Sequence, residues 1–213
     1  MLTIHEIYLS IQGESTHAGL PCAFVRLSAC DLRCVWCDTP YAFTEGRRML
    51  VGDVVLQVEA LACTLVEITG GEPLLQPGVY TLMRTLLDRG FEVLLETGGH
   101  IPLDQVPDEV VTIVDVKCPA SGEANRMHWP NLDLLSAHDE VKFVIQDRAD
   151  FDYACEVTTR HNLTGQVAAV HFSPVHGALA PAELARWILD SRLPVRLQLQ
   201  QHKYIWDPAT RGV

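Results

Sequence analysis

The stretch Cys30-Asp-Leu-Arg-Cys34-Val-Trp-Cys37 places three cysteines in eight residues, with Asp38 and Thr39 directly after them. Three thiolates are one too few for a closed tetrahedral zinc site, and a [4Fe–4S] cluster normally takes four cysteines, one for each iron. A cluster held by three cysteines keeps one iron open to a ligand that the protein does not supply. The spacing therefore indicates a catalytic centre rather than a simple electron carrier.

Two other interpretations of the cysteine spacing stay open at this point. A structural zinc ion could recruit Cys22, Cys118 or a histidine as a fourth ligand, although the sequence has no second cysteine pair. A ferredoxin-like cluster would need a fourth, suitably placed cysteine. The chain has seven cysteines in all, an odd number that favours metal binding over disulfides in a reducing compartment.

The composition is typical of a globular protein in solution, with 48% hydrophobic and 20% charged residues among 213. This length predicts a single domain over residues 1–213. The net charge of −11 disfavours direct contact with nucleic-acid phosphates, so we expect a small-molecule substrate. The sequence shows neither a signal-peptide pattern nor the roughly 20 apolar residues that span a bilayer, so we expect a cytoplasmic protein without membrane contact.

Short apolar runs alternate with helical patterns, and this rhythm predicts an α/β fold with a mostly parallel sheet. The predicted strands are 23–28, 65–69, 92–96, 111–116, 140–145, 167–172 and 195–200. The predicted helices are 77–89 and 181–190, with a shorter apolar stripe at Val54, Val58 and Leu61 behind Asp53 as a candidate cap. A full eight-stranded barrel of such units takes about 250 residues, so we expect an incomplete, TIM-like β/α barrel.

Polar residues gather where the predicted strands end. These ends read Thr69-Gly-Gly-Glu72, Glu96-Thr-Gly-Gly99, Asp115-Val-Lys117, Gln146-Asp147, His171-Phe-Ser173 and Gln200-Gln-His-Lys203. In α/β barrels and open α/β sheets, the active site lies at the carboxyl ends of the strands. We therefore expect a ligand site at this edge, with Gln198 and Gln200 alternating onto one face of the last strand.

The cysteine loop resembles the C-x3-C-x2-C signature of the radical S-adenosylmethionine (radical SAM) enzymes, and Thr69-Gly70-Gly71-Glu72-Pro73 resembles their second motif. The resemblance implies a radical SAM core in which Cys30, Cys34 and Cys37 hold a [4Fe–4S] cluster, with S-adenosylmethionine on the open iron. One electron from the cluster would cleave the sulfonium to a 5′-deoxyadenosyl radical, while the protein positions and shields both cofactors.

Further motifs narrow the resemblance to the 7-carboxy-7-deazaguanine synthase family. They are Ile11-Gln12-Gly13-Glu14, Phe24-Val-Arg26-Leu, Trp36-Cys37-Asp38-Thr39, Thr69-Gly70-Gly71-Glu72-Pro73, Glu96-Thr97-Gly98, Asp115-Val116-Lys117 and Gln201-His202-Lys203-Tyr204. The family implies a carbon–nitrogen lyase that contracts the ring of 6-carboxy-5,6,7,8-tetrahydropterin to 7-carboxy-7-deazaguanine and releases ammonia, in queuosine and deazapurine biosynthesis. Two stretches depart from the family pattern, Gln-Gly-Glu-Ser15 and Thr-Gly-Gly-His100.

The resemblance also implies roles for individual residues. Those implied to contact S-adenosylmethionine are Trp36, Cys37, Asp38, Gly71, Glu72, Asp115, Val116, Lys117 and Ser173. Those implied to contact the pterin are Ile11, Gln12, Gly13, Glu14, Arg26, Thr69 and Glu96. Thr39 matches the residue that supplies an oxygen ligand to Mg²⁺. Simpler roles stay open for Trp36 as a core aromatic, Thr39 as a helix cap and Ser173 as a turn residue.

Arg26 is informative on physical grounds, because it stands in the otherwise apolar run Ala-Phe-Val-Arg-Leu. A buried guanidinium needs an anion, either the substrate carboxylate or a protein acid such as Glu72 or Glu96. Glu96 would suit the two N–H donors of the guanidine-like edge of a pterin, unless it is solvated or pairs with Arg26. We predict that Cys63, Cys118 and Cys155 are core residues and that His202 could reach the site.

The resemblance further implies a homodimer and an external one-electron reductant of the flavodoxin or ferredoxin type. Two alternative functions stay open. One is a radical SAM activase that makes a glycyl radical on a partner protein and needs neither Arg26 nor Glu96. The other is a non-catalytic zinc or iron–sulfur binding module, which the metal content of anaerobically purified protein would reveal.

Overall fold

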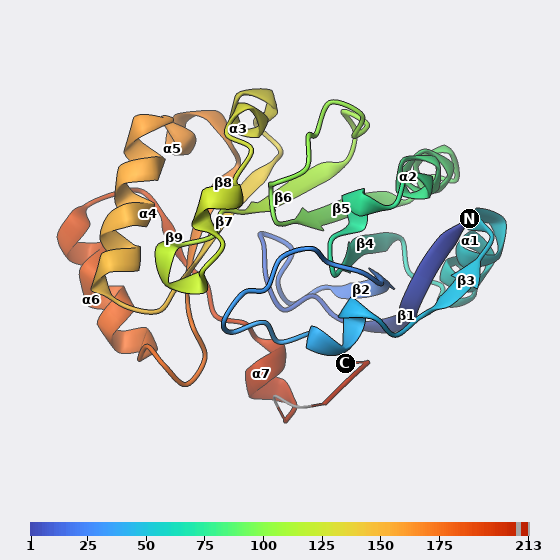
Figure 1. Cartoon of the computed structure of the whole chain (residues 1–213), viewed down its shortest axis with the longest axis horizontal. Coiled ribbons are helices and arrows are strands. Elements are labelled where there is room, and N and C mark those ends of the chain that lie inside the picture. Colours follow the sequence, from blue (N-terminus) through green and yellow to red (C-terminus); the bar gives the residue numbers. More distant parts are fainter. Residues whose placement is uncertain (208–209, 213) are drawn as a thin grey trace.

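The computed structural model describes residues 1–207 and 210–212, so residues 208, 209 and 213 of the predicted domain lie outside the described part. Within the described residues, nine strands form one sheet in the order β3-β1-β2-β4-β5-β6-β7-β8-β9, which curves through the centre of Figure 1. The strands are β1 (Leu2–Ile11), β2 (Pro21–Leu27), β3 (Arg47–Met49), β4 (Leu65–Gly70), β5 (Glu92–Thr97), β6 (Val111–Asp115), β7 (Glu140–Ile145), β8 (Ala169–Pro174) and β9 (Arg196–Leu197).

From β2 to β9, every pair of neighbouring strands is parallel, whereas β1 runs antiparallel to both β2 and β3. The two edge strands, β3 and β9, do not pair with each other, so the sheet stays open instead of closing into a barrel. This arrangement confirms the predicted α/β fold with a mostly parallel sheet and an incomplete barrel.

Helices flank the sheet, with α1 and α2 on one flank and α4 and α6 on the opposite flank (Figure 1). The α-helices are α1 (Val51–Ala60), α2 (Gly78–Asp88), α3 (Pro130–Leu134), α4 (Arg148–Arg160), α5 (Leu163–Gln166), α6 (Pro181–Ser191) and α7 (His202–Ile205). Short 3₁₀ helices are η1 (Pro40–Phe43), η2 (Pro73–Leu75), η3 (Pro119–Ser121) and η4 (Ala124–Arg126). Helix α2 lies within the predicted helix 77–89 and buries Val79, Leu82, Met83 and Leu86.

The two faces of the sheet differ in chemistry because side chains alternate along each strand. The outer face packs its apolar residues, such as Val66, Ile68 and Leu95, into the large core shared with the helices. The inner face has a small apolar cluster of Cys22, Phe24, Leu65, Leu94 and Ile113 near the amino ends of its strands. Two to four residues further along the same face, the side chains become polar, which places a polar layer at the carboxyl edge.

Several predicted elements differ from the observed ones. The predicted strand 195–200 is regular only at Arg196–Leu197, and Gln198 and Gln200 instead donate hydrogen bonds to the turn between β1 and β2. Asp53 is not the cap of α1, since the helix begins at Val51 and Asp53 lies in its first turn, where a carboxylate favours the helix dipole. The strand list also omitted β1 and β3, and the helix list omitted α4.

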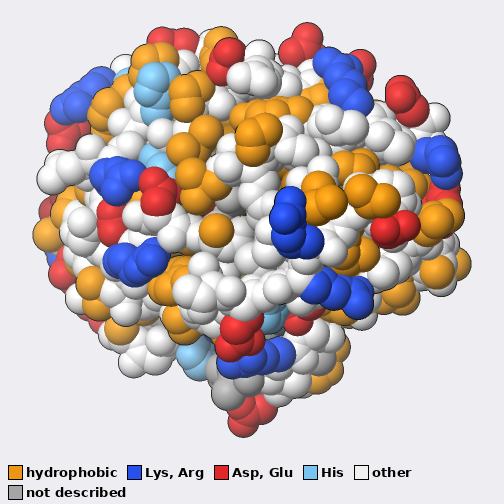
Figure 2. All heavy atoms as spheres, turned by 45° about the vertical axis from the view of Figure 1, so that its right-hand side comes forward, with side chains coloured by type: hydrophobic (Ala, Val, Ile, Leu, Met, Phe, Trp, Pro, Cys, Tyr) orange, Lys and Arg blue, Asp and Glu red, His pale blue; other side chains and the backbone are white. Residues whose placement is uncertain are grey.

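The surface is mixed in character. On the face shown in Figure 2, Lys and Arg side chains are interspersed with acidic and neutral ones instead of gathering in one basic patch. Among the described residues, no helix has the length and apolar character needed to cross a membrane.

Candidate active site

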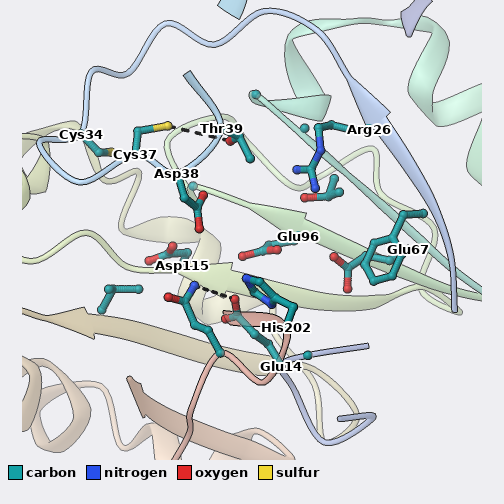
Figure 3. Close-up of a pocket in the computed structure, with 18 of the residues that line it drawn as sticks. Glu14, Arg26, Cys34, Cys37, Asp38, Thr39, Glu67, Glu96, Asp115 and His202 are labelled. Carbon is teal, nitrogen blue, oxygen red and sulfur yellow. Dashed lines mark hydrogen bonds between the residues drawn. The ribbon is translucent and has the colours of Figure 1, made fainter. Parts of the chain in front are cut away.

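One cavity opens at the carboxyl ends of the parallel strands and is shared by the cysteine loop and the polar inner face of the sheet. Figure 3 shows Cys34 and Cys37 at one end of this cavity, Arg26 and Glu67 at the other, and Glu96 between them. The strand residues that line it are Tyr8, Ile11, Phe24, Arg26, Glu67, Thr69, Gly70, Glu96, Thr97, Asp115, Lys142 and Val144. The predicted ligand site at this edge is therefore a real concavity with charged walls.

The cysteine loop leaves β2 through Ala29, whose φ of 75° is an unusual, strained conformation for a residue with a Cβ. The loop then turns so that the Cys37 N–H donates to the Cys34 carbonyl oxygen at 3.2 Å. All three thiols are free, partly buried and directed at the same cavity. Burial raises the pKa of the Cys34 thiol to about 11, so at neutral pH this sulfur keeps its proton unless a metal cation displaces it.

The Thr69–Pro73 motif is fastened to the start of the cysteine loop by backbone hydrogen bonds. The N–H groups of Gly71 and Glu72 donate to the carbonyl oxygens of Leu27 and Ala29 at 3.1 and 2.8 Å. A Cβ at Gly71 would lie 1.9 Å from the Ala29 oxygen, so only glycine fits there. This close approach of two protein segments explains the glycine without reference to a ligand.

Glu72 is buried and holds the ends of β4 and β5 together. Its carboxylate accepts hydrogen bonds from the Thr97 hydroxyl at 2.9 and 3.0 Å and from the Gly98 and Leu74 N–H groups at 2.9 and 3.1 Å. Burial nevertheless raises its pKa, since these donors only partly offset the loss of water. The departure from the family pattern at His100 also packs here, with its Nδ1 3.8 Å from Glu72 and its Nε2 2.6 Å from Asp31.

The ammonium group of Lys142 pairs with acidic side chains in the middle of the cavity. Lys142 on β7 is 4% exposed and its Nζ donates to Glu14 at 2.8 Å and to Glu96, with Asp115 at 3.8 Å. Burial lowers the pKa of Lys142, but Glu14 and Glu96 outweigh this effect and raise it well above its usual range. For Glu14, burial raises the pKa, but Lys142 and Gln200 outweigh this effect, so the pKa of Glu14 is lowered overall. Glu14 is therefore an ionised carboxylate at neutral pH.

Arg26 has a protein partner and also faces the cavity. Its Nε donates to Glu6 at 2.8 Å and its terminal nitrogen donates to the Tyr8 hydroxyl at 3.0 Å, both on the antiparallel strand β1. The alternative of a protein acid as partner is therefore borne out, but by Glu6 and not by the two acids named, since Glu72 binds Thr97 and Gly98 while Glu96 binds Lys142. The guanidinium still lines the cavity, where its remaining N–H groups could meet an anion.

The turn between β1 and β2 closes the side of the cavity against the C-terminal segment. The Gln201 N–H donates to the Gly13 carbonyl oxygen at 3.0 Å, and the Gln200 amide donates to Glu14 at 2.9 Å. A Cβ at Gly13 would lie 2.5 Å from His202 Nδ1, so the two segments touch at a glycine. His202 also lines the cavity, as considered from the sequence.

The structure brings together nearly all of the predicted site residues. Those that line the cavity are Ile11, Gln12, Gly13, Glu14, Arg26, Cys30, Cys34, Trp36, Cys37, Asp38, Thr39, Thr69, Gly71, Glu72, Glu96, Asp115 and Lys117. Two do not line it: Val116 packs into the outer core, and Ser173 is fully buried on β8. The simpler role of Trp36 as a core aromatic is wrong, because the ring is half-buried at the cavity wall.

The chemistry of these residues fits a cluster and S-adenosylmethionine. Three thiols on one loop are a suitable donor set for three irons. One buried oxygen of the cavity lining, Asp115 Oδ1, has no hydrogen-bond partner within the described part of the chain. Buried polar atoms are rarely left without partners, so this atom fits a polar group of a bound molecule.

Thr39 is also free to take a ligand. It occupies the residue before η1, but its side chain makes no cap hydrogen bond, so the role of helix cap is wrong. Its hydroxyl lies 3.9 Å from Cys37 Sγ and faces the same cavity. Of the three cysteines predicted to be core residues, Cys118 is buried, while Cys63 and Cys155 pack against the core and are partly exposed.

Sequence reasoning missed the residues that complete the site, chiefly Lys142, Glu67, Tyr8 and Lys203. Lys203 pairs with Asp38 at 2.9 Å, and Glu67 accepts a hydrogen bond from Gln12. Lys142 and Glu67 each interrupt an apolar strand, as Arg26 does. The signal that identified Arg26 was therefore available for both of them.

Comparison with known proteins identifies the class of this fold and site. Residues 25–162 match the family model of the Radical SAM superfamily, so the chain belongs to that superfamily. It is 50% identical to a 7-carboxy-7-deazaguanine synthase from Koribacter versatilis (strain Ellin345) over all of both chains. It is 46% identical to a protein of the same name from Chlorobaculum tepidum, over 100% of this chain and 97% of the relative. The chain therefore belongs to the 7-carboxy-7-deazaguanine synthase family.

A solved structure agrees with this fold. The crystal structure of QueE from Escherichia coli superposes with a TM-score of 0.70, covers 93% of both chains and is 21% identical in sequence. At this level of identity the likeness supports the fold, while the family assignment rests on the full-length relatives.

Proposed function

We propose that this chain contracts the ring of 6-carboxy-5,6,7,8-tetrahydropterin to 7-carboxy-7-deazaguanine and releases ammonia. The observation that carries the proposal is that one cavity joins the three-cysteine loop to a wall of charged side chains on the sheet. The first part suits radical formation, and the second suits a small, polar heterocycle with a carboxylate. The full-length relatives named 7-carboxy-7-deazaguanine synthase favour this function over glycyl-radical activation and over a metal-binding module.

Each end of the cavity has its own task in this proposal. Cys30, Cys34 and Cys37 would hold the cluster. Residues of the same cavity would contact S-adenosylmethionine, namely Trp36, Asp38, Gly71, Glu72, Asp115 and Lys117, whereas Val116 and Ser173 lie behind its wall. When bound, the two cofactors supply a 5′-deoxyadenosyl radical that removes a hydrogen atom from the substrate. The surrounding wall keeps water away from that radical.

The opposite end would hold the pterin. Arg26 has donors to spare beyond Glu6 and Tyr8, so it suits the substrate carboxylate. Glu96, held in place by Lys142, suits the N–H donors of the guanidine-like edge. Ile11, Gln12, Gly13, Glu14 and Thr69 would enclose the ring from the adjacent turn and strand. Such fixed positioning lowers the entropic cost of the reaction.

Further parts of the proposal concern Mg²⁺, the reductant and the assembly. Thr39 would give its hydroxyl, which makes no cap hydrogen bond, to Mg²⁺, whose other ligands would come from substrate and water. We also propose a cytoplasmic homodimer that receives electrons from a flavodoxin-like or ferredoxin-like protein. Sedimentation velocity tests the dimer, and turnover with each reductant, with and without Mg²⁺, tests the others.

The experiment that tests the function is anaerobic turnover of the iron-loaded protein with reductant, S-adenosylmethionine and 6-carboxytetrahydropterin. We expect 7-carboxy-7-deazaguanine and ammonia in equal amounts. If 5′-deoxyadenosine forms without the deazaguanine, the substrate is wrong although the class is right. A colourless protein that binds zinc and forms no 5′-deoxyadenosine would overturn the proposed function altogether.

A further inference from the structure

Glu67 is a buried acid in the cavity to which the proposed reaction gives no role. It lies in the middle of β4 between Val66 and Ile68, and its side chain points to the inner face of the sheet. The residue is 4% exposed. Figure 3 shows it at the end of the cavity away from the cysteines, near Arg26. Its position is therefore that of a group that meets the substrate rather than the cofactors.

The carboxyl group of Glu67 has no cation of its own within the described residues. Gln12 donates a hydrogen bond to its Oε2. The nearby cations are engaged elsewhere, since Lys142 pairs with Glu14 and Glu96, while Arg26 pairs with Glu6. A buried carboxylate without a cation is costly, so the neutral acid is the favoured form at this position.

The groups around Glu67 also favour its neutral form. Burial, followed by the charges of Glu96 on β5 and Glu14 in the turn, raises the pKa of Glu67 to about 8, against the opposing effects of Gln12 and Lys142. The other titratable groups facing it are Tyr8 on β1 and Cys22 on β2, and burial raises the pKa of both. Glu67 is thus neutral at pH 7, unlike Glu14.

The two forms of a carboxyl group recognise different partners. An ionised carboxylate only accepts hydrogen bonds, so it complements two adjacent donors. A neutral carboxyl donates through one oxygen and accepts through the other, so it complements an adjacent donor and acceptor. A tetrahydropterin has both kinds of edge. Its 2-amino group and N3–H are two donors, whereas N1 is an acceptor beside the donor N8–H.

We propose that Glu67 is a specificity-determining residue that binds the N1 and N8–H edge of the pterin as a neutral carboxyl, beside Glu96 on the donor–donor edge. This inference rests on the proposed function. The strand register supports the pairing, because Glu67 and Glu96 stand on the same face of neighbouring strands, with Glu67 opposite Leu94. Gln12 takes one lone pair of Oε2 and leaves the second to accept from N8–H, while Oε1 can carry the proton that is donated to N1.

The test compares Glu67→Gln, Glu67→Ala and Glu96→Gln in the iron-loaded protein, with KM and kcat for 6-carboxytetrahydropterin measured anaerobically at pH 7 and pH 9. Glutamine keeps one donor and one acceptor, so Glu67→Gln should raise KM only about threefold at pH 7. Glu67→Ala and Glu96→Gln should each raise it at least about tenfold, the size of a lost hydrogen bond. The changes should fall on KM more than on kcat, as expected for a contact already made in the bound substrate.

The pH dependence separates recognition from a merely structural role. For a pKa of about 8, the neutral fraction of Glu67 falls about tenfold between pH 7 and pH 9, so the wild-type KM should rise about tenfold. In Glu67→Gln this rise should be absent, because the amide does not titrate. The inference is overturned if Glu67→Gln raises KM as much as Glu96→Gln does, if Glu67→Ala leaves KM unchanged, or if wild type and Glu67→Gln share one pH profile. A wild-type enzyme that makes no deazaguanine would instead reject the proposed function.

Discussion

At one end of the cavity a single loop supplies Cys30, Cys34 and Cys37, whereas at the other end the charged residues Arg26, Glu67, Glu96 and Lys142 come from four different strands. The cysteine end depends on local spacing, and its chemistry is shared by a whole superfamily. The strand end depends on register, since Arg26, Glu96 and Lys142 meet only after the sheet has formed. The reaction type is thus encoded locally, and substrate recognition is encoded by the fold.

The largest expected effect comes from breaking the cysteine end. Cys34→Ser removes one of the three thiolates, so we expect iron content and 5′-deoxyadenosine formation to fall to background. Iron analysis after anaerobic reconstitution measures this loss. Cys155→Ser on α4 is the matched control and should keep its iron, since Cys155 does not line the cavity. Full iron content in Cys34→Ser would contradict the assignment of the loop.

At the strand end, Lys142→Met should cause the largest loss of stability. The change leaves the partly buried Glu14 and Glu96 without their cation, so we expect the free energy of unfolding to fall by about 3 kcal/mol. Urea denaturation at pH 7 measures it, and the loss should shrink at pH 5 as carboxylates take up protons. Arg160→Met, which breaks an exposed pair with Glu156, should cost less than about 0.5 kcal/mol. Equal losses in the two variants would show that the buried network is not stabilising.

Arg26→Gln should affect substrate binding at the strand end and leave radical formation at the cysteine end nearly unchanged. It removes a charged donor from the proposed carboxylate site, so KM for the pterin should rise roughly 10- to 100-fold, equivalent to about 1.5–3 kcal/mol. The loss of uncoupled 5′-deoxyadenosine formation should be much smaller, because the cysteines are untouched. Steady-state kinetics and product analysis measure both quantities, with exposed Arg84→Gln as the control. An unchanged KM would favour a structural role with Glu6, or an activase.

The smallest effect concerns the turn that closes the strand end. Burial raises the pKa of Glu140, but hydrogen bonds from His171 and Thr16 have a larger, opposite effect. The pKa of Glu140 is therefore lowered overall. A carboxylate with a lowered pKa in the folded state stabilises the protein above the unfolded value of about 4.3, and this contribution is lost as the pH falls through the folded value. Below pH 5, the free energy of unfolding should therefore fall by about 1 kcal/mol less in Glu140→Gln than in wild type. Parallel urea-derived profiles for wild type and variant would refute this linkage.

The sequence allowed the fold class and the cysteine end to be predicted because both depend on neighbouring residues. Apolar runs with polar ends indicated parallel strands, and the C-x3-C-x2-C spacing indicated an open cluster. Strand β9 was predicted too long, because the Gln198 N–H still donates to Phe172 on β8, whereas Gln200 bonds to Glu14 in the turn through its side chain. Tertiary contacts outweighed strand propensity at Gln200.

The strand end could be predicted only in part. Arg26 was identified as a buried cation, but its partner Glu6 lies on β1, an antiparallel strand absent from the predicted set. Lys142 and Glu67 carry the same signal of a charge within an apolar strand. Which acid meets which base depends on the order of β2, β4, β5, β6 and β7 in the sheet, and local patterns do not determine that order.

The contacts between the β1–β2 turn and the C-terminal segment bear on how the protein is made. Gln198, Gln200 and Gln201 bond to Ser15, Glu14 and Gly13, so the first turn of the chain is held by residues near its end. During synthesis, the cysteine loop leaves the ribosome long before these glutamines do. The wall around the substrate therefore closes only when residues 183 and 186 positions apart meet, and such long-range contacts slow folding.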